Sequence, residues 1–155
     1  SKETAYQITS ILEGTVKRGT AKKLKDLNLD LGGKTGTTNK NTDTWFIGFS
    51  SNFVIGVYVG YDNPSSLGRY ETGSRTAMPI FKNFVKNAIK KDNARPFKIP
   101  KGIKMLVVNS KTGERASYSD ESIIIEAFKE KNLINNKIQY GNIDYISKEN
   151  IYKFY

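Results

Sequence analysis

The sequence contains no cysteine and no histidine. A chain without these residues has no thiolate nucleophile, no imidazole base and none of the usual zinc ligands. Any catalysis therefore has to use Ser, Thr, Lys, Tyr or carboxylate side chains. We expect no metal ion and no cofactor.

Long apolar runs are also absent. No segment approaches the roughly 20 consecutive apolar residues that a membrane-spanning helix needs. No basic-then-apolar signal sequence opens the chain. We expect no membrane segment in this chain and a soluble chain as it stands, whose 155 residues suffice for one domain that buries roughly two-thirds of its unfolded surface.

Positive charge is plentiful, with a formal net charge of +10 from 25 Lys and Arg residues and 15 Asp and Glu residues. A basic surface is typical of nucleic-acid binding. Many of the cations, however, fall between residues 82 and 104, where Asp92 is the only acid and aromatic residues are few. We interpret this segment as a solvated helix face followed by a linker and expect no nucleic-acid partner.

Two stretches have the apolar spacing of amphipathic helices. Residues 3–18 predict a helix that ends near Gly19. Residues 76–91 predict a second one, with Thr76 as N-cap and apolar pairs every four residues.

Between these helices the pattern changes to strands. Residues 31–38 predict a short strand, and residues 44–49 and 53–61 predict a hairpin joined by Ser50-Ser51-Asn52. Both alternating faces of the hairpin are apolar and contain glycines, which predicts strands covered on both faces and approached closely by helices. We place Trp45 in this core rather than against a ligand.

The C-terminal third is less regular. Residues 94–102 are a proline-punctuated linker. Residues 103–108 and 114–118 predict a small hairpin around the turn at 109–113, and residues 121–133 predict a short helix. The last twenty residues have no firm period, so we assign them no structure.

Lys34 lies in a Gly-Lys-Thr string, and two explanations compete for it. A phosphate-binding P-loop needs a glycine five positions before the Gly-Lys pair, and that position is Asn28. A P-loop also follows a strand and opens a helix, whereas here a helix precedes the string and strands follow it. We therefore reject nucleotide binding.

The other explanation is an edge strand that binds an extended ligand. On such a strand Lys34 and Gly36 point to one face and Thr35 and Thr37 to the other, while free backbone groups can pair with the ligand. Two hydroxyls and an ammonium suit a carboxylate-bearing partner.

The stretch GGKTGTTNKNTDTWFIGF resembles the K-[ST]-G-T-T-N segment and following strand of penicillin-binding transpeptidases. Further stretches at 5–21, 54–68, 71–84 and 123–129 are similar, in the same order, to the C-terminal part of the bifunctional class A members. The resemblance covers roughly residues 1–130. It implies an α+β fold in which an antiparallel sheet, the K-T-G strand plus a hairpin, is packed by flanking helices.

The resemblance also implies a reaction and residue roles. In this family a serine attacks the D-Ala-D-Ala carbonyl of a peptidoglycan stem peptide, and β-lactams mimic that dipeptide. Lys34 would lie beside the S-x-N serine, where it would supply positive potential and help proton transfer. Thr35, Thr37 and the adjacent Thr38 would bind substrate, the first two by holding its carboxylate. Gly36 would allow close backbone approach, and the Thr37 N–H would be an oxyanion-hole donor.

A loop before the second helix is a further candidate. The resemblance places Thr72 and Gly73 near the substrate, but we favour a surface turn for these two residues. The second K-T-G, at 111–113, and the S-x-N string at 50–52 both lie on the wrong side of the first K-T-G for the family pattern. We interpret both as turns.

The sequence departs from the family because no serine in it is followed three residues later by lysine. Without this S-x-x-K nucleophile we expect no acyl transfer by the chain alone. We divide it into residues 1–92, the C-terminal portion of a transpeptidase domain; 93–130, a linker, small hairpin and short helix; and 131–155, a tail.

The partners expected from the resemblance are the stem peptide, β-lactams and the missing N-terminal part of the domain, on the extracytoplasmic face of the bacterial inner membrane. A fragment, a split-gene product and a decayed remnant all stay open. The alternative function is a non-catalytic, basic binding or interaction module.

Overall fold

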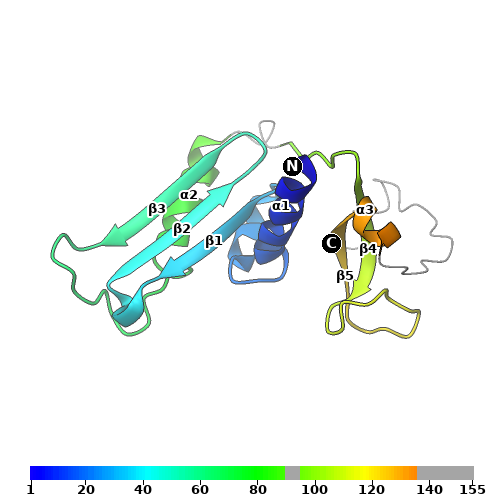
Figure 1. Ribbon diagram of the computed structural model, residues 1–155. Helices are drawn as coiled ribbons and strands as arrows, with labels where there is room; N and C mark the ends of the chain where they lie inside the picture. The colour runs from blue at the N-terminus through cyan, green and yellow to red at the C-terminus, as the bar shows by residue number, and fades with distance from the viewer. Residues whose placement is uncertain (90–94, 136–155) are drawn as a thin grey trace. The chain divides into compact units, whose positions relative to one another are not determined.

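The computed structural model describes residues 1–89 and 95–135 of the chain (Figure 1). They divide into two compact units. One lies within Ile11–Lys98, and the other combines Ser1–Ser10 with the described residues from Ile99 onward. The tail predicted at 131–155 lies mostly outside the described residues.

The larger unit is built on a three-stranded antiparallel sheet with the strand order β1-β2-β3 (Figure 1). Its strands are β1 (Gly32–Thr37), β2 (Asp43–Phe49) and β3 (Val54–Gly60). Between β2 and β3 the Ser50 N–H donates to the Phe53 carbonyl at 3.0 Å. The predicted strand and hairpin are confirmed, and the S-x-N string is a turn.

Helix α2 (Ala77–Ala88) covers one face of this sheet. Phe81 is fully buried against Phe46, with ring centroids 5.0 Å apart. A Cβ at Gly48 would come within 2.5 Å of the Phe81 ring, so glycine is needed where the helix meets β2. Burial of one such phenylalanine stabilises the fold by about 1.5–3 kcal/mol.

Three further segments complete this core. Helix α1 (Lys2–Lys17) adds Val16, and the 3₁₀ helix η1 (Lys22–Leu27) adds Leu24. Leu31 precedes β1 and is 1% exposed. The predicted helix at 3–18 is confirmed, and the core lies between α2, η1 and the inner face of the sheet.

The opposite face of the sheet is open. Trp45 is 43% exposed, Ile47 48% and Tyr58 49%. The prediction of strands covered on both faces is therefore wrong for the described residues, and so is the placement of Trp45 in the core. The reason is the two-residue period of a strand, which points Trp45 away from its buried neighbour Phe46.

The smaller unit contains an antiparallel pair, β4 (Ile103–Asn109) with β5 (Ile123–Lys129), followed by α3 (Glu130–Asn135). The predicted partner strand at 114–118 is reduced to one bridge, between Val108 and Arg115. The helix predicted over 121–133 is also wrong in its first part. The alternation of Ile, Glu and Ala side chains buries every second residue, which suits a strand.

The first residues of α1 belong to the smaller unit. The Gln7 side-chain amide donates to the Ala127 carbonyl at 3.0 Å, and the Lys129 ammonium donates to the Thr4 hydroxyl at 2.6 Å. These bonds join the beginning of the chain to β5.

Two cations of the basic segment pair with acidic side chains. Lys82 pairs with Asp26 at 2.5 Å, and Lys104 pairs with Glu130 at 3.1 Å. Lys90, Lys91 and Asp92 lie outside the described residues. These pairings favour the solvated helix face and linker over a continuous basic surface.

Among residues 1–89 and 95–135, no helix combines the length and apolarity needed to cross a membrane. In the same described ranges, no three carboxylate-bearing residues gather as they would around a metal ion.

Candidate functional site

The direction of backbone groups on β1 follows from one hydrogen bond at its end. The Thr38 N–H donates to the Asp43 carbonyl at 3.0 Å. In an antiparallel ladder, opposite residues alternate between bonded and non-bonded pairs. Gly36 and Lys34, two and four residues before Thr38, therefore direct their backbone groups to β2. Thr35, and Gly33 and Thr37 two positions to either side of it, direct their backbone groups to the outer edge.

Two contacts at the outer edge agree with this alternation of backbone directions. The Gly33 carbonyl accepts a hydrogen bond from Thr15 Oγ1 at 2.8 Å, and the Thr35 carbonyl accepts one from Lys34 Nζ at 2.7 Å. By the same alternation, the backbone N–H of Thr37 points outward. The outer edge of β1 therefore offers backbone groups at the spacing of an added strand.

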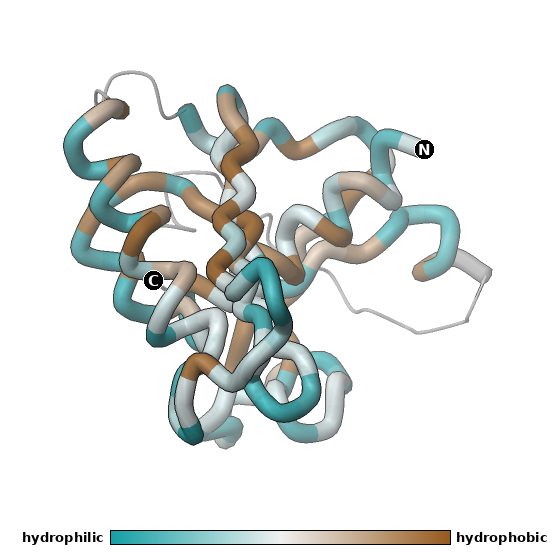
Figure 2. Tube along the Cα trace, turned by 90° about the vertical axis from the view of Figure 1, so that its left-hand side faces the viewer, coloured by the Kyte–Doolittle hydropathy of each residue, from teal (hydrophilic) through white to brown (hydrophobic). Residues whose placement is uncertain are grey.

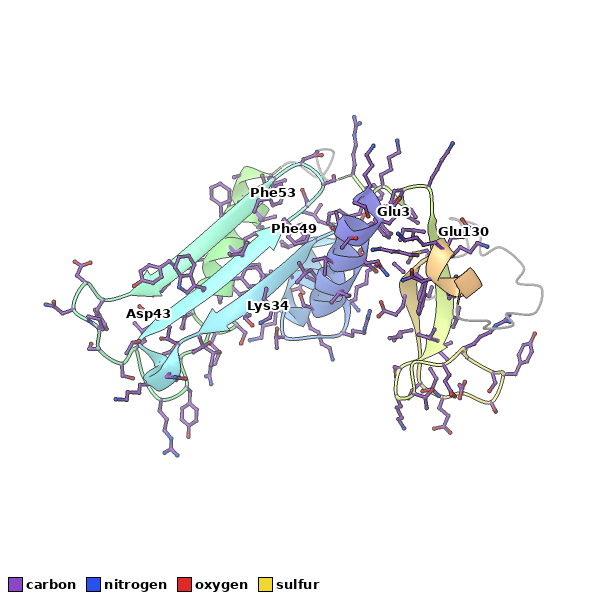
Figure 3. The ribbon with its side chains drawn as sticks, in the orientation of Figure 1. Glu3, Lys34, Asp43, Phe49, Phe53 and Glu130 are labelled. Carbon is purple, nitrogen blue, oxygen red and sulfur yellow. The ribbon has the colours of Figure 1, made fainter. Side chains whose placement is uncertain are left out.

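The side chains of β1 alternate as the sequence predicts. Lys34 and Gly36 lie on the face of their partners Ile47 and Trp45, while Thr35 and Thr37 lie on the other face. Lys34 is exposed, and its side chain extends from the middle of β1 (Figure 3). Because Lys34 Nζ contacts the Thr35 carbonyl, its charge is held at the outer edge.

The loop before α2 packs directly on β1. The Gly73 N–H donates to Thr37 Oγ1 at 3.1 Å. A Cβ at Gly73 would lie 2.3 Å from the Trp45 carbonyl oxygen and 2.7 Å from that of Gly36. Thr72 starts a turn before the helix, as predicted. The expected surface position is wrong for Gly73, which is buried.

Thr37 is the residue on which strand and loop meet. A threonine hydroxyl has one proton to donate and two lone pairs to accept with. Gly73 occupies one lone pair, which leaves the Thr37 proton for another acceptor. With the Lys34 ammonium and the outward N–H of Thr37, this edge is rich in donors and suits a carboxylate or a developing oxyanion.

Thr38 lies just beyond the strand, in a polar cluster around Asp43 (Figure 3). The Asp43 carboxylate accepts hydrogen bonds from Tyr58 at 2.7 Å, Thr42 at 3.0 Å and Thr38 at 3.2 Å. The Tyr58 hydrogen bond, with help from the two threonines, lowers the pKa of Asp43 below its usual range. The same bond raises the pKa of Tyr58.

Asp43 and Tyr58 were not found by sequence reasoning. Asp43 begins β2 and Tyr58 lies near the end of the adjacent strand β3, where it also packs on Trp45 with ring centroids 4.8 Å apart. Their cluster fixes the end of β1 where Thr37 leads into Thr38. The polar composition of residues 38–43 was the available signal, but it does not identify Tyr58 as the partner.

Asn41 was also missed. It has a left-handed backbone with φ 54, and its side-chain amide donates to the Glu71 carbonyl at 2.7 Å. Asparagine tolerates this conformation better than most residues, so a turn was predictable at this position. Its partner thirty residues away was not.

The second K-T-G triplet is a turn, as predicted. Gly113 has φ +74, and Asn109 Oδ1 accepts a hydrogen bond from the Lys111 N–H at 2.8 Å. The first triplet lies within β1 and not in a loop that opens a helix, which agrees with the rejection of a P-loop.

Comparisons with known proteins agree on one family. A family model described as "Penicillin binding protein transpeptidase domain" matches residues 1–86. Penicillin-binding protein 1A of Rickettsia conorii (strain ATCC VR-613 / Malish 7) is 45% identical over 144 residues, which cover 93% of this chain and 17% of that protein. Penicillin-binding protein 1A of Pseudomonas aeruginosa is 40% identical over 127 residues, which cover 81% of this chain and 16% of that protein.

A solved structure is similar as well. The crystal structure of penicillin-binding protein 1A from Haemophilus influenzae matches with a TM-score of 0.73 and 32% identity, over 83% of this chain and 20% of that chain. The chain thus spans a fifth or less of the length of these relatives.

Proposed function

Because the chain belongs to the family of penicillin-binding protein transpeptidase domains, we propose that it is the C-terminal part of a class A D-Ala-D-Ala transpeptidase that cross-links peptidoglycan. The observation that carries this proposal is the outer edge of β1. There the Lys34 ammonium, the Thr37 hydroxyl and the outward Thr37 N–H are donors carried by four consecutive residues of the strand. Such a set matches a ligand that has a terminal carboxylate and a reacting carbonyl.

Each residue of this edge receives a role in the proposal. Lys34 places positive charge beside the reacting group and assists proton transfer. Thr35 and Thr37 bind the terminal carboxylate of the stem peptide or of a β-lactam, with Thr38 continuing the binding segment. Gly36 lets the ligand approach the backbone, and the Thr37 N–H is one of two donors to the oxyanion.

The chemistry needs a serine that this sequence does not provide, since it contains no S-x-x-K string. We propose that another segment supplies it, either in the same protein or as a separate chain. The serine oxygen then bonds to the D-Ala carbonyl carbon and expels the terminal D-alanine. An amine of a neighbouring strand takes the acyl group from the serine.

The proposed organisation of the chain rests on the family match over residues 1–86. Residues 1–92 form the C-terminal portion of the transpeptidase domain, and residues 93–130 form an extension that contains the β4–β5 pair. By family membership the domain acts on the extracytoplasmic face of the bacterial inner membrane.

The test is acylation by a fluorescent penicillin, followed on a gel. We expect label on the serine-bearing segment only when that segment is joined to, or mixed with, this chain. Label on the serine-bearing segment without this chain would contradict the role of β1. Absence of label with both parts soluble would favour a remnant or a basic binding module.

Lys34→Ala sharpens this test because the chain offers a matched control. Lys111 is also exposed and begins the same triplet, but it lies in a turn of the other unit. We expect Lys34→Ala to slow acylation by about 100-fold or more and Lys111→Ala to leave it unchanged. Equal rates for the two variants would remove Lys34 from the mechanism.

A further inference from the structure

The loop between β3 and α2 is tied to the turn that follows β1. In Figure 1 this loop runs beside the short 3₁₀ helix η2 (Asn39–Asn41). The Leu67 N–H donates to the Asn41 carbonyl at 2.8 Å. The Asn41 side-chain amide donates to the carbonyls of Glu71 at 2.7 Å and Arg69 at 3.3 Å. One residue thus makes three hydrogen bonds to a segment about thirty positions away.

The segment held in this way leads directly to Gly73. Two hydrogen bonds also tie this segment to the start of α2. The Met78 N–H donates to the Gly73 carbonyl at 2.8 Å, and Thr76 Oγ1 donates to the Glu71 carboxylate. Asn41 therefore fixes one end of a short span and α2 fixes the other. Gly73, between them, donates to Thr37.

Polar residues dominate this part of the molecule. Viewed from the end of the sheet where β3 leads into the loop, the foreground connections are mostly hydrophilic in Figure 2. The loop therefore gains little from apolar burial, and its position depends on hydrogen bonds such as those of Asn41.

We propose that Asn41 is a positioning residue for Thr37, an inference that rests on the transpeptidase function proposed above. By holding the loop, Asn41 keeps the Gly73 N–H on one lone pair of the Thr37 hydroxyl. The hydroxyl proton is then turned away from the loop and donated to the carboxylate of the bound stem peptide or β-lactam. Asn41 touches neither ligand nor reacting atoms.

Two properties of Asn41 are required at once. Its φ of 54 favours Asn, Asp or Gly, and its bonds to Glu71 and Arg69 need two N–H donors, which only Asn among these has. Asn41→Asp keeps the size and the backbone tolerance but places a carboxylate against two carbonyl oxygens. Asn41→Gly keeps the backbone conformation and removes the amide.

Asn28 provides the matched control. It has φ 51 and ends η1, where its backbone N–H donates to the Lys25 carbonyl at 3.0 Å. Asn28 is exposed and lies outside the strand-and-loop contact. Asn28→Asp therefore makes the same chemical change at the same backbone conformation without touching the loop.

The first arm of the test is a double-mutant cycle on penicillin acylation, with this chain joined to or mixed with the serine-bearing segment. We expect Asn41→Asp to lower the second-order acylation rate about 5- to 20-fold, the size expected for losing one or two hydrogen bonds. Asn28→Asp should leave the rate unchanged. In a Thr37→Val background, Asn41→Asp should cause no further loss, because its effect passes through the hydroxyl.

A purely structural role for Asn41 would lower the rate by the same factor in both backgrounds. That additive result would overturn the proposal, as would an unchanged rate in Asn41→Asp.

The second arm does not depend on acylation. Hydrogen exchange of the 67–74 segment, measured by mass spectrometry, should become about tenfold faster in Asn41→Asp and Asn41→Gly and stay unchanged in Asn28→Asp. Unchanged exchange in the Asn41 variants would overturn the proposal. If wild-type protein exchanges as expected but is not acylated, the transpeptidase function fails and the inference about Thr37 fails with it, while Asn41 keeps its hold on the loop.

Discussion

Replacing Gly73 by alanine should separate the loop from β1 without changing any polar side chain. The added Cβ would lie 2.3 Å from the Trp45 carbonyl oxygen and 2.7 Å from that of Gly36. Both atoms belong to the backbone of paired strands, so neither can move without disturbing the ladder. The loop has to move instead.

The size of the movement follows from these distances. The shortest carbon–oxygen contacts in proteins are about 3.3 Å, so the loop must retreat by about 1 Å. The bond from the Gly73 N–H to Thr37, now 3.1 Å, would then exceed hydrogen-bond range. Strain from overpacking costs about 1–3 kcal/mol and the lost bond about 0.5–1.5 kcal/mol. We expect a loss of about 2–4 kcal/mol in the free energy of unfolding.

Chemical unfolding followed by tryptophan fluorescence measures this loss. Trp45 is the only tryptophan in the sequence, and its own carbonyl is one of the two atoms that the new Cβ would meet. Gly56→Ala is the matched control, because the nearest atom to a Cβ there is Ile47 Cγ1 at 4.0 Å. If Gly73→Ala unfolds at the same denaturant concentration as Gly56→Ala, the packing of the loop on β1 is not as described.

Two further predictions concern acid and the open sheet face. Since hydrogen bonds lower the pKa of Asp43 in the folded chain, its contribution to stability is present above its ordinary pKa of 3.8 and is lost as pH falls through the lower folded value. Unfolding curves below about pH 4 should therefore depend less on pH in Asp43→Asn than in wild type, and a parallel pH dependence would contradict this. The chain alone should bind a hydrophobic dye and unfold with low cooperativity, because Trp45, Ile47 and Tyr58 are exposed together. A cooperative melt at high temperature without dye binding would show that this face needs no cover.

The strands of the larger unit were predictable because their signals are local. Aromatic and β-branched residues are frequent in β2 and β3, and the polar residues Ser50, Ser51 and Asn52 interrupt them. The same two-residue period placed Lys34 and Gly36 on one face of β1 before the register was known. What the pattern could not reveal was how many faces are covered, because an apolar side chain such as Trp45 looks the same whether or not a helix lies over it.

The segment at 121–133 illustrates a different limit. Its apolar residues are compatible with either a helix or a strand, and a short apolar run does not separate the two by periodicity. Pairing with β4 decides the matter, because Ile125 and Val107 are direct cross-strand partners. Only the last residues of the predicted helix, in α3, are helical.

The loop contacts were beyond reach for a physical reason. Gly73 and Asn41 act on residues about thirty or more positions away, through hydrogen bonds that leave no spacing in the sequence. A glycine before a helix and an asparagine in a turn are both common. Their roles depend on the loop after β3, which brings the chain back to β1 and to the turn that follows it.

The two K-T-G triplets explain why the motif alone does not make a site. In the turn at Lys111, the Asn109 side chain accepts the N–H groups of residues 111 and 112, so the donors there already have a partner within the turn. In β1 the extended backbone sends alternate N–H groups to β2 and to the outer edge, and the N–H of Thr37 is among those directed outward. The Gly73 N–H of the loop then donates to the Thr37 hydroxyl oxygen, which leaves the Thr37 hydroxyl proton for a ligand. The same three residue types thus present donors to a ligand in β1, whereas in the turn at 111–113 the backbone donors are already bonded to Asn109. This is why we expect Lys34, and not Lys111, to matter for acylation.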